Sequence, residues 1–344
     1  MDRVLEIGGH AAGYCGRLHV HAGDDVVRVE TGDTPPAWAS TTAMDTYLHA
    51  GKRRIATSDP GLIRSLADKA DIVVCEAGTA DALLALGFDD WQTGVKLAIT
   101  PFGLTGPKRN WRATPSTLLA MGGYTYLTGD PGRSPLTLPG HYVEFQAGAL
   151  GYTSAVACRF NDTDDCIDLA MLDTVMSLSQ FTTVRWHCTG EIRTRHGNDF
   201  YFVVPSNLYP CEDGWIYINI VPTFWDAFVV FVDMPELLVD ERFMTNDLRI
   251  EHREVLHTLT APFFGGQTRQ ALFERAEAVR VPLGMVQSLA EVLADPHLAE
   301  RRFWHPAKVE GQPVKCPDLP FQLDDRQLRA LELNEPRTTG DFGA

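Results

Sequence analysis

The feature that most constrains the fold is an alternation, over the first hundred residues, of short apolar runs with stretches of helical periodicity. The apolar runs, rich in Val, Ile and Leu, are residues 4–7, 26–30, 72–75 and 96–100. Between them, residues 59–69 and 80–86 place apolar side chains at helical spacing. Strands that alternate with helices form a parallel sheet covered by helices, so we predict an α/β layer for this part of the chain.

The second half of the chain has a different pattern. An aromatic strand is predicted at residues 215–220, followed by amphipathic helices near 224–232, 250–259 and 270–278. This order predicts a separate α+β domain that begins near residue 205, and a length of 344 residues accommodates two domains. Residues 122–140, rich in Gly, Pro and Thr, form a loop long enough to be functional.

Composition excludes several classes of partner. The net charge of −15 repels a phosphate backbone, so we expect no nucleic-acid partner. No apolar run reaches 18 residues and the first twenty residues lack signal-peptide features, so we expect no membrane association. The seven cysteines are scattered without a CxxC pair, which predicts reduced thiols, a cytoplasmic location and no thiolate zinc site.

The glycine-rich turn after the first predicted strand resembles a dinucleotide-binding fingerprint, with Glu30 about twenty residues on. However, Gly8, Gly9, Gly13 and Gly16 do not supply the G-x-G-x-x-G spacing, so we do not expect NAD binding. The alternative is that Gly13 and Gly16 allow the first helix to pack closely on the sheet.

Histidines offer two weaker candidates for a functional site. His19 and His21 lie two residues apart and could share a metal only from a strand, and no third ligand accompanies them in the sequence, so we expect both to be solvated and no metal to be bound. His141 follows Pro139 and Gly140 in a loop and could act as an acid or base, although such histidines are more often structural or exposed.

Asp173 is the most unusual carboxylate. Residues 166–171 alternate as in a strand and a helical rhythm begins at Leu172, which places Asp173 in the first turn of a helix. Unpaired N–H groups and the positive end of the helix dipole keep a carboxylate there ionised, as a nucleophile requires. Plain first-turn capping is the commoner explanation, and the residues alone leave both open.

Several strings in colinear order resemble one enzyme family. They are VLEIGGHAAGYCGRL (4–18), GKRR (51–54), ITPFGLTGP (99–107), IDLAMLDT (167–174), NLYPCEDGWIYINI (207–220) and ADPHLAERRFW (294–304). Together they are similar to the family III CoA-transferases, the CaiB/BaiF group that includes formyl-CoA:oxalate and carnitine CoA-transferases and α-methylacyl-CoA racemase.

The resemblance implies a Rossmann-like large domain formed by residues 1–190 and 306–344, a linker at 191–204 and a small α+β domain at 205–305. It also implies an interlocked homodimer. The implied activity moves CoA from an acyl-CoA thioester to a carboxylic acid, with CoA as substrate and no permanently bound cofactor.

The resemblance also assigns site residues. Asp173 lies at the position of the catalytic carboxylate, which forms an anhydride and then an aspartyl-CoA thioester. Lys52, Arg53 and Arg112 match basic residues suited to CoA phosphates, and His10 and Ala11 match the segment that lines the CoA channel.

Carbonyl attack requires N–H donors for the developing oxyanion, which the loop around Gly122 and Gly123 could supply, with His141 as a further loop candidate. Met121–Tyr124 occupies the position of a racemase acid/base element, and Val221 that of its second base. Acyl exchange is therefore favoured over racemase or lyase chemistry, which ranks third. The second hypothesis is a non-catalytic acyl-CoA-binding subunit or module, because the chain is shorter than typical members of the family.

Overall fold

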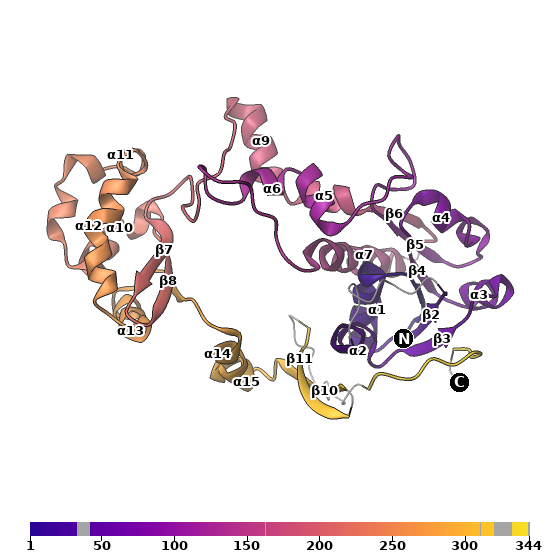
Figure 1. The fold of residues 1–344 in the computed structure, drawn as a ribbon. Coiled ribbons are helices and arrows are strands. Elements are labelled where there is room, and N and C mark those ends of the chain that lie inside the picture. Colours follow the sequence, from indigo (N-terminus) through magenta and orange to yellow (C-terminus); the bar gives the residue numbers. More distant parts are fainter. Residues whose placement is uncertain (33–41, 162, 310, 320–331, 343–344) are drawn as a thin grey trace. The chain divides into compact units, whose positions relative to one another are not determined.

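The computed structural model describes residues 1–32, 42–161, 163–309, 311–319 and 332–342 (Figure 1). Contacts between Cα atoms divide the chain into two units. The first comprises Met1–Thr125, Thr137–Arg193 and His297–Ala344, and the second comprises Tyr126–Leu136 and Thr194–Pro296. Residues 126–136 thus group with the second unit rather than with the large domain, and our sequence-based boundaries stay a prediction.

The first unit contains a six-stranded sheet in the order β3-β2-β1-β4-β5-β6. All neighbouring strands are parallel. This is the strand order of doubly wound Rossmann folds, which confirms the predicted fold class. The predicted strands fall within β1, β2, β4 and β5. The bounds are β1 (Arg3–Ile7), β2 (Asp25–Glu30), β3 (Arg53–Ala56), β4 (Ile72–Glu76), β5 (Val95–Thr100) and β6 (Cys166–Ala170).

Helices cover both faces of this sheet. Apolar residues of α1, α5 and α7 form a core with one face, and those of α3 and α4 form a core with the other. The bounds are α1 (His10–Ala22), α2 (Thr42–His49), α3 (Pro60–Ala67), α4 (Ala80–Leu84), α5 (Pro115–Met121), α6 (Tyr124–Leu127), α7 (Tyr142–Phe160), α8 (Met171–Ser177) and α9 (Gln180–Thr189).

Three helices begin at the edge where the carboxyl ends of the parallel strands meet. Helix α1 follows β1 after a short turn, and α8 follows β6 directly. Helix α7 runs back to the amino end of β6, so its own first residues lie at the opposite edge of the sheet, which is the carboxyl edge. Ligands of open α/β sheets bind at this edge, so we expect the functional site to lie there.

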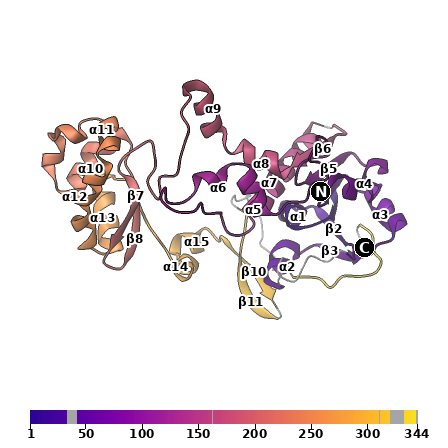
Figure 2. The ribbon, with the colours of Figure 1, turned by 45° about the horizontal axis from the view of Figure 1, so that its top comes forward.

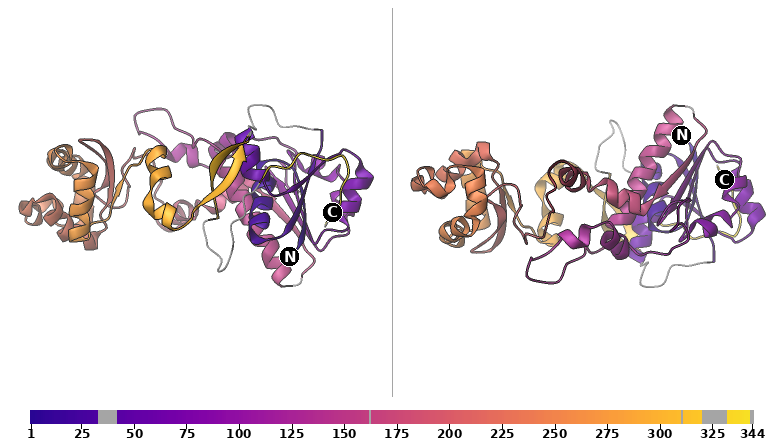
Figure 3. Two further views of the ribbon diagram at one scale, coloured as in Figure 1. Left: turned by 90° about the horizontal axis from the view of Figure 1, so that it is seen from below. Right: turned by 90° about the horizontal axis from the view of Figure 1, so that it is seen from above.

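The second unit has a three-stranded antiparallel sheet in the order β7-β8-β9 with helices packed on it. Its core contains the fully buried Phe228, Phe231, Phe243 and Phe264. In Figures 2 and 3 the orange helices of this unit gather beside β7 and β8. The bounds are β7 (Ser206–Cys211), β8 (Gly214–Asn219), α10 (Trp225–Val232), α11 (Asn246–Glu251), α12 (Arg253–Gly265), α13 (Arg269–Val279), β9 (Leu283–Met285) and α14 (Leu289–Ala294).

The chain then returns to the first unit. Helix α15 (Pro296–Glu300) leads to an antiparallel hairpin, β10 (Trp304–Val309) and β11 (Gln312–Pro317), and β10 contacts α2. Four short 3-10 helices complete the described part: η1 (Phe88–Asp90), η2 (Pro222–Phe224), η3 (Pro235–Leu238) and η4 (Glu241–Phe243). Among the described residues, every helix is too short or too polar to cross a bilayer.

Candidate active site

Asp173 lies in the first turn of α8, immediately after β6, as the sequence pattern predicts. Asp173 is exposed, so its carboxylate is accessible to a substrate. The start of α8 is fixed to the neighbouring strand's end, because the N–H of Leu172 donates to the carbonyl of Pro101, 3.1 Å away. The backbone that carries the Asp173 carboxylate is therefore fixed by this hydrogen bond at the carboxyl edge of the sheet.

Gly122 and Gly123 lie beside this helix. A Cβ on Gly122 would come within 2.4 Å of Cγ1 of Val175, so α5 ends in close contact with α8. However, the N–H of Gly122 donates to Leu118 O at 2.8 Å and that of Gly123 to Ala120 O at 3.3 Å. This differs from the expectation that they serve an oxyanion, because both donors already terminate α5.

His10 and His141, 131 positions apart in the sequence, meet around Glu144. Nδ1 of His141 lies 3.2 Å and Nδ1 of His10 lies 3.9 Å from Oε1 of Glu144, and the two imidazole rings are 4.2 Å apart. Burial raises the pKa of Glu144, but its interactions with His10 and His141 lower it overall. A carboxylate between two imidazoles can hold or move a proton at this edge of the sheet.

Glu144 was not singled out from the sequence, although its position three residues after His141, in the first turn of α7, is the signal that could have found it. An acidic residue in a first turn is so often a simple cap that this signal is weak.

A second carboxylate that the sequence did not reveal is Glu76, the last residue of β4. Its Oε2 accepts the N–H of Ala12 at 2.8 Å, within the first turn of α1. Gly8 has φ +132°, and a Cβ there would lie 2.5 Å from Cβ of Glu76. Burial raises the pKa of Glu76, and the N–H donated by Ala12 only partly opposes this rise. Glu76 thus occupies the position where a dinucleotide fold binds pyrophosphate.

Lys52 differs from its predicted role. Its side chain is fully buried, with Nζ 2.5 Å from Oε2 of Glu6, 2.7 Å from the carbonyl of Gly13 and 3.3 Å from Nδ1 of His49. Burial lowers the pKa of Lys52 to about 8, against the attraction of Glu6. The ammonium is enclosed and paired, so it is not presented to a CoA phosphate in this structure.

Arg53 also lies away from Asp173. It begins β3, so it stands at the amino edge of the parallel sheet, where it pairs with Asp25 at the start of β2. The difference has a simple topological reason: a residue that precedes a parallel strand lies at the edge opposite to one that follows a strand.

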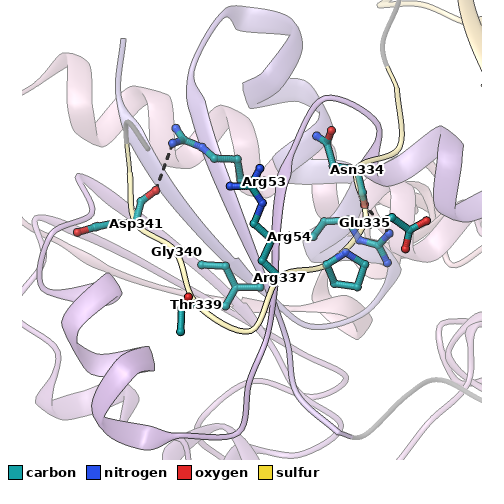
Figure 4. Close-up of a pocket in the computed structure, with 10 residues that line it drawn as sticks. Arg53, Arg54, Asn334, Glu335, Arg337, Thr339, Gly340 and Asp341 are labelled. Atoms are coloured by element: carbon teal, nitrogen blue, oxygen red, sulfur yellow. Dashed lines mark hydrogen bonds between the residues drawn. The ribbon is translucent and has the colours of Figure 1, made fainter.

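Beside Arg53 is a cavity of about 320 Å³ between β3 and the C-terminal segment, which pairs with β3 through Ile55 and Arg337. In Figure 4, Arg53 donates to the carbonyl of Asp341 at 3.2 Å and Arg54 to that of Asn334 at 3.0 Å. These arginines fasten the segment to the sheet, and Asp173 does not line the cavity.

Of the remaining predicted residues, Arg112 is exposed in the loop that follows β5, at the carboxyl side. Ala11 is fully buried in the first turn of α1. Topology therefore brings Asp173, His10, His141 and Arg112 to the carboxyl side of the sheet, and it leaves Arg53 at the other side.

Comparisons with known proteins decide the family. The sequence matches the profile of CoA-transferase family III over residues 2–341. The chain belongs to CoA-transferase family III.

Two relatives and one solved structure illustrate the likeness. The chain is 29% identical to a succinyl-CoA–D-citramalate CoA-transferase of Chloroflexus aurantiacus, over 87% of this chain and 81% of that protein. It is 25% identical to the BbsE subunit of succinyl-CoA:(R)-benzylsuccinate CoA-transferase of Thauera aromatica, over 97% and 90% respectively. A CaiB/BaiF family protein from Brucella suis shares the fold, with TM-score 0.79, 23% identity and coverage of 98% of this chain and 95% of that one.

Proposed function

We propose that this family III chain transfers CoA from an acyl-CoA thioester to a carboxylic acid, with Asp173 as the nucleophile. The observation that carries the proposal is the position of Asp173: exposed, directly after a strand, at the edge of a doubly wound sheet where ligands bind. The family match supports the CoA thioester as substrate.

In the first half of the reaction, a carboxylate oxygen of Asp173 attacks the thioester carbonyl carbon and the C–S bond breaks. The products are a mixed anhydride and the CoA thiolate. The thiolate then attacks the Asp173 carbonyl carbon, the anhydride C–O bond breaks, and the donor acid leaves as its carboxylate. An incoming carboxylate repeats the two steps in reverse order and leaves with CoA. The covalent route thus divides one difficult exchange into several easier carbonyl attacks.

His10, Ala11 and Arg112 remain our candidates for contacts with CoA, and His141 with Glu144 for the neighbourhood of the reacting groups. Exposed Arg112 suits an anionic phosphate. Lys52, Arg53, Gly122 and Gly123 are not carried into this proposal, because their side chains or N–H groups already have partners.

The experiment is to trap the covalent intermediate. The protein is incubated with acyl-CoA, treated with hydroxylamine or borohydride, digested, and analysed by mass spectrometry. We expect the modification on Asp173 alone. Turnover without any adduct on Asp173 would contradict the mechanism.

A pair of variants sharpens this test. We expect Asp173→Asn to lower kcat by about four orders of magnitude or more, because the amide is a poor nucleophile. Asp247→Asn is the matched control, since Asp247 is also an exposed carboxylate in the first turn of a helix, α11. The control should retain parental activity, and equal rates for the Asp173 variant and the parent would refute the assignment.

The relatives suggest which acids to test first. Those named above use succinyl-CoA with D-citramalate or (R)-benzylsuccinate, both dicarboxylates. We therefore propose succinyl-CoA as the first donor and short dicarboxylates as acceptors. A panel with monocarboxylates as the comparison measures this preference by kcat/KM.

We also propose that the chain acts as a homodimer. Exposed apolar side chains gather on and around α9, among them Phe181, Val184, Trp186 and Ile192, and a second copy would cover them. Light scattering after size exclusion should give twice the chain mass of 38.1 kDa.

The second candidate is a subunit that acts only with a partner chain, which the naming of BbsE as a subunit favours. Robust CoA exchange by the purified homodimer would eliminate it, whereas exchange that requires a co-purified partner would establish it.

A further inference from the structure

Three residues far apart in the sequence form a buried cluster outside the candidate active site. His21 lies in the last turn of α1, His305 lies on β10, and Asp318 follows β11. Nδ1 of His21 is 2.6 Å from Oδ1 of Asp318, and Nδ1 of His305 is 3.5 Å from Oδ2. The potential ligand atoms of all three lie within 4.8 Å of one another.

Both imidazoles are almost completely enclosed, with 2% of His21 and 4% of His305 exposed. Nε2 of His21 and both ring nitrogens of His305 have no hydrogen-bond partner among the described residues. A neutral imidazole always carries one N–H donor and one lone pair, so a buried ring with neither satisfied is destabilising. The hydrogen bond between His21 and Asp318 does not account for His305.

A metal ion between the three side chains would account for it. Imidazole nitrogen and carboxylate oxygen are zinc ligands at about 2.0–2.2 Å, which sets ligand atoms a little over 3 Å apart in tetrahedral geometry. The potential ligand atoms of the three residues lie within 4.8 Å of one another, and the two imidazoles face the two oxygens of one carboxylate, so a single ion could bind all three side chains after they turn toward it.

We propose that His21, His305 and Asp318 bind one divalent transition-metal ion, with zinc as the best fit, and that this ion fastens the β10–β11 hairpin to α1. Imidazole ligands favour zinc over magnesium and calcium, which prefer oxygen. The role is structural, because the last turn of α1 lies at the amino side of the sheet, opposite to Asp173.

One nearby side chain carries a positive charge that would repel a bound metal ion. Arg17, one turn before His21 on α1, donates Nη2 to the carbonyl of Pro317 at 2.6 Å. It also packs over the ring of Tyr47 at 4.1 Å. Its charge is thus partly compensated by the carbonyl and the ring, and the ionised Asp318 faces the proposed metal position.

The sequence did not reveal this site. We expected His19 and His21 to be solvated, but both are buried, and their two rings have different partners: His19 pairs with Asp24 at 2.8 Å. The ligands that accompany His21 are almost three hundred residues further along the chain, so no spacing motif could show them.

The test uses the full chain. The protein is stripped with a chelator, dialysed against zinc chloride and then against metal-free buffer, and its zinc content is measured by mass spectrometry of the ashed sample. We expect about one ion per chain and a thermal midpoint that rises with zinc concentration. A chain that retains no zinc, with an unchanged midpoint, overturns the proposal.

Variants locate the ion. His305→Gln and Asp318→Asn should both reduce retained zinc to background, while His187→Gln, which changes an exposed histidine on α9, should not. His141→Gln is the decisive comparison, because His10, His141 and Glu144 form a second group of potential ligands. Zinc lost only in the His141 variant would place the ion there and overturn the proposal.

If a variant folds poorly, cobalt(II) substitution in the parent chain supplies an independent readout, since four-coordinate cobalt bound to nitrogen and oxygen absorbs visible light strongly. Asp173→Asn should keep its zinc, so loss of the proposed activity and loss of the metal site are distinguishable. Octahedral, weakly absorbing cobalt would contradict tetrahedral coordination by the three side chains and one water.

Discussion

The crossing of α1 and α7 depends on Gly148, and its replacement by Ala tests the packing that brings His10 near His141. An added Cβ would lie 2.5 Å from the carbonyl oxygen of Ala11 and 3.1 Å from the backbone nitrogen of Cys15. Both atoms belong to the backbone of α1, so only a shift of one helix relieves the overlap. Overpacking of this kind costs about 1–3 kcal/mol.

A matched variant separates this packing cost from helix propensity. Gly151 lies on the same helix, and its added Cβ would lie 2.7 Å from Cδ2 of Leu97, which is the end of a side chain and not a backbone atom. Both Gly→Ala changes gain about 1 kcal/mol of helix propensity. We therefore expect Gly151→Ala to be neutral or stabilising, and Gly148→Ala to be less stable than Gly151→Ala by about 1–3 kcal/mol.

Differential scanning calorimetry of both variants and the parent measures the effect, at about 2–4 °C in thermal midpoint per kcal/mol for a unit of this size. The amide signals of α1 in NMR spectra should shift in the Gly148 variant and not in the Gly151 variant. Equal midpoints for the two variants would show that the two helices do not meet as closely as the structure has them.

Two other perturbations give equally direct readouts. Burial lowers the pKa of Lys52 from 10.5 to about 8, so the unfolded chain binds more protons than the folded chain between these pH values. The contribution of Lys52 to the free energy of unfolding therefore rises with pH in this range, by about 3 kcal/mol. Lys52→Met should lack this rise when urea titrations at pH 8 and 10.5 are compared, and parallel pH profiles for the variant and the parent would contradict the prediction. In the second unit, the hydroxyl of Tyr209 lies 2.5 Å from Nδ1 of His257, whose Nε2 lies 2.9 Å from Asp199. Tyr209→Phe should therefore cost about 1–2 kcal/mol by leaving a ring nitrogen unpaired, whereas Tyr217→Phe, at a more exposed hydroxyl that pairs with Ser206, should cost less. Equal costs for the two tyrosine variants would contradict the role given to the buried chain of hydrogen bonds.

Sequence patterns predicted the elements whose signals are local. The apolar runs of β1, β2, β4 and β5, and the change from strand to helix around Asp173, follow from periodicity alone. Strand β3 escaped because it is short, lies at the sheet's edge and reads Arg-Arg-Ile-Ala. The expectation that Lys52 and Arg53 serve a phosphate came from the family resemblance and not from a local pattern.

The contacts that escaped prediction join residues distant in sequence. Lys52 pairs with Glu6, and Glu76 reaches the first turn of α1, each across more than forty positions. Charge counting treats every Lys and Glu as solvated, whereas a buried pair is visible only once the strand order is known. Fold class is therefore predictable from local pattern, and the charge state of a site is not.

Glu76 shows how one such contact can change the use of a common fold. The strand order and the glycine turn would direct an anion to the first N–H groups of α1, as in dinucleotide-binding proteins. Here a carboxylate of the protein accepts one of those groups, and Gly8 and Gly9 leave the space it fills. A phosphate at that turn would compete with Glu76 for the N–H of Ala12, so we expect the phosphates of CoA at other parts of the carboxyl edge, where Arg112 is exposed.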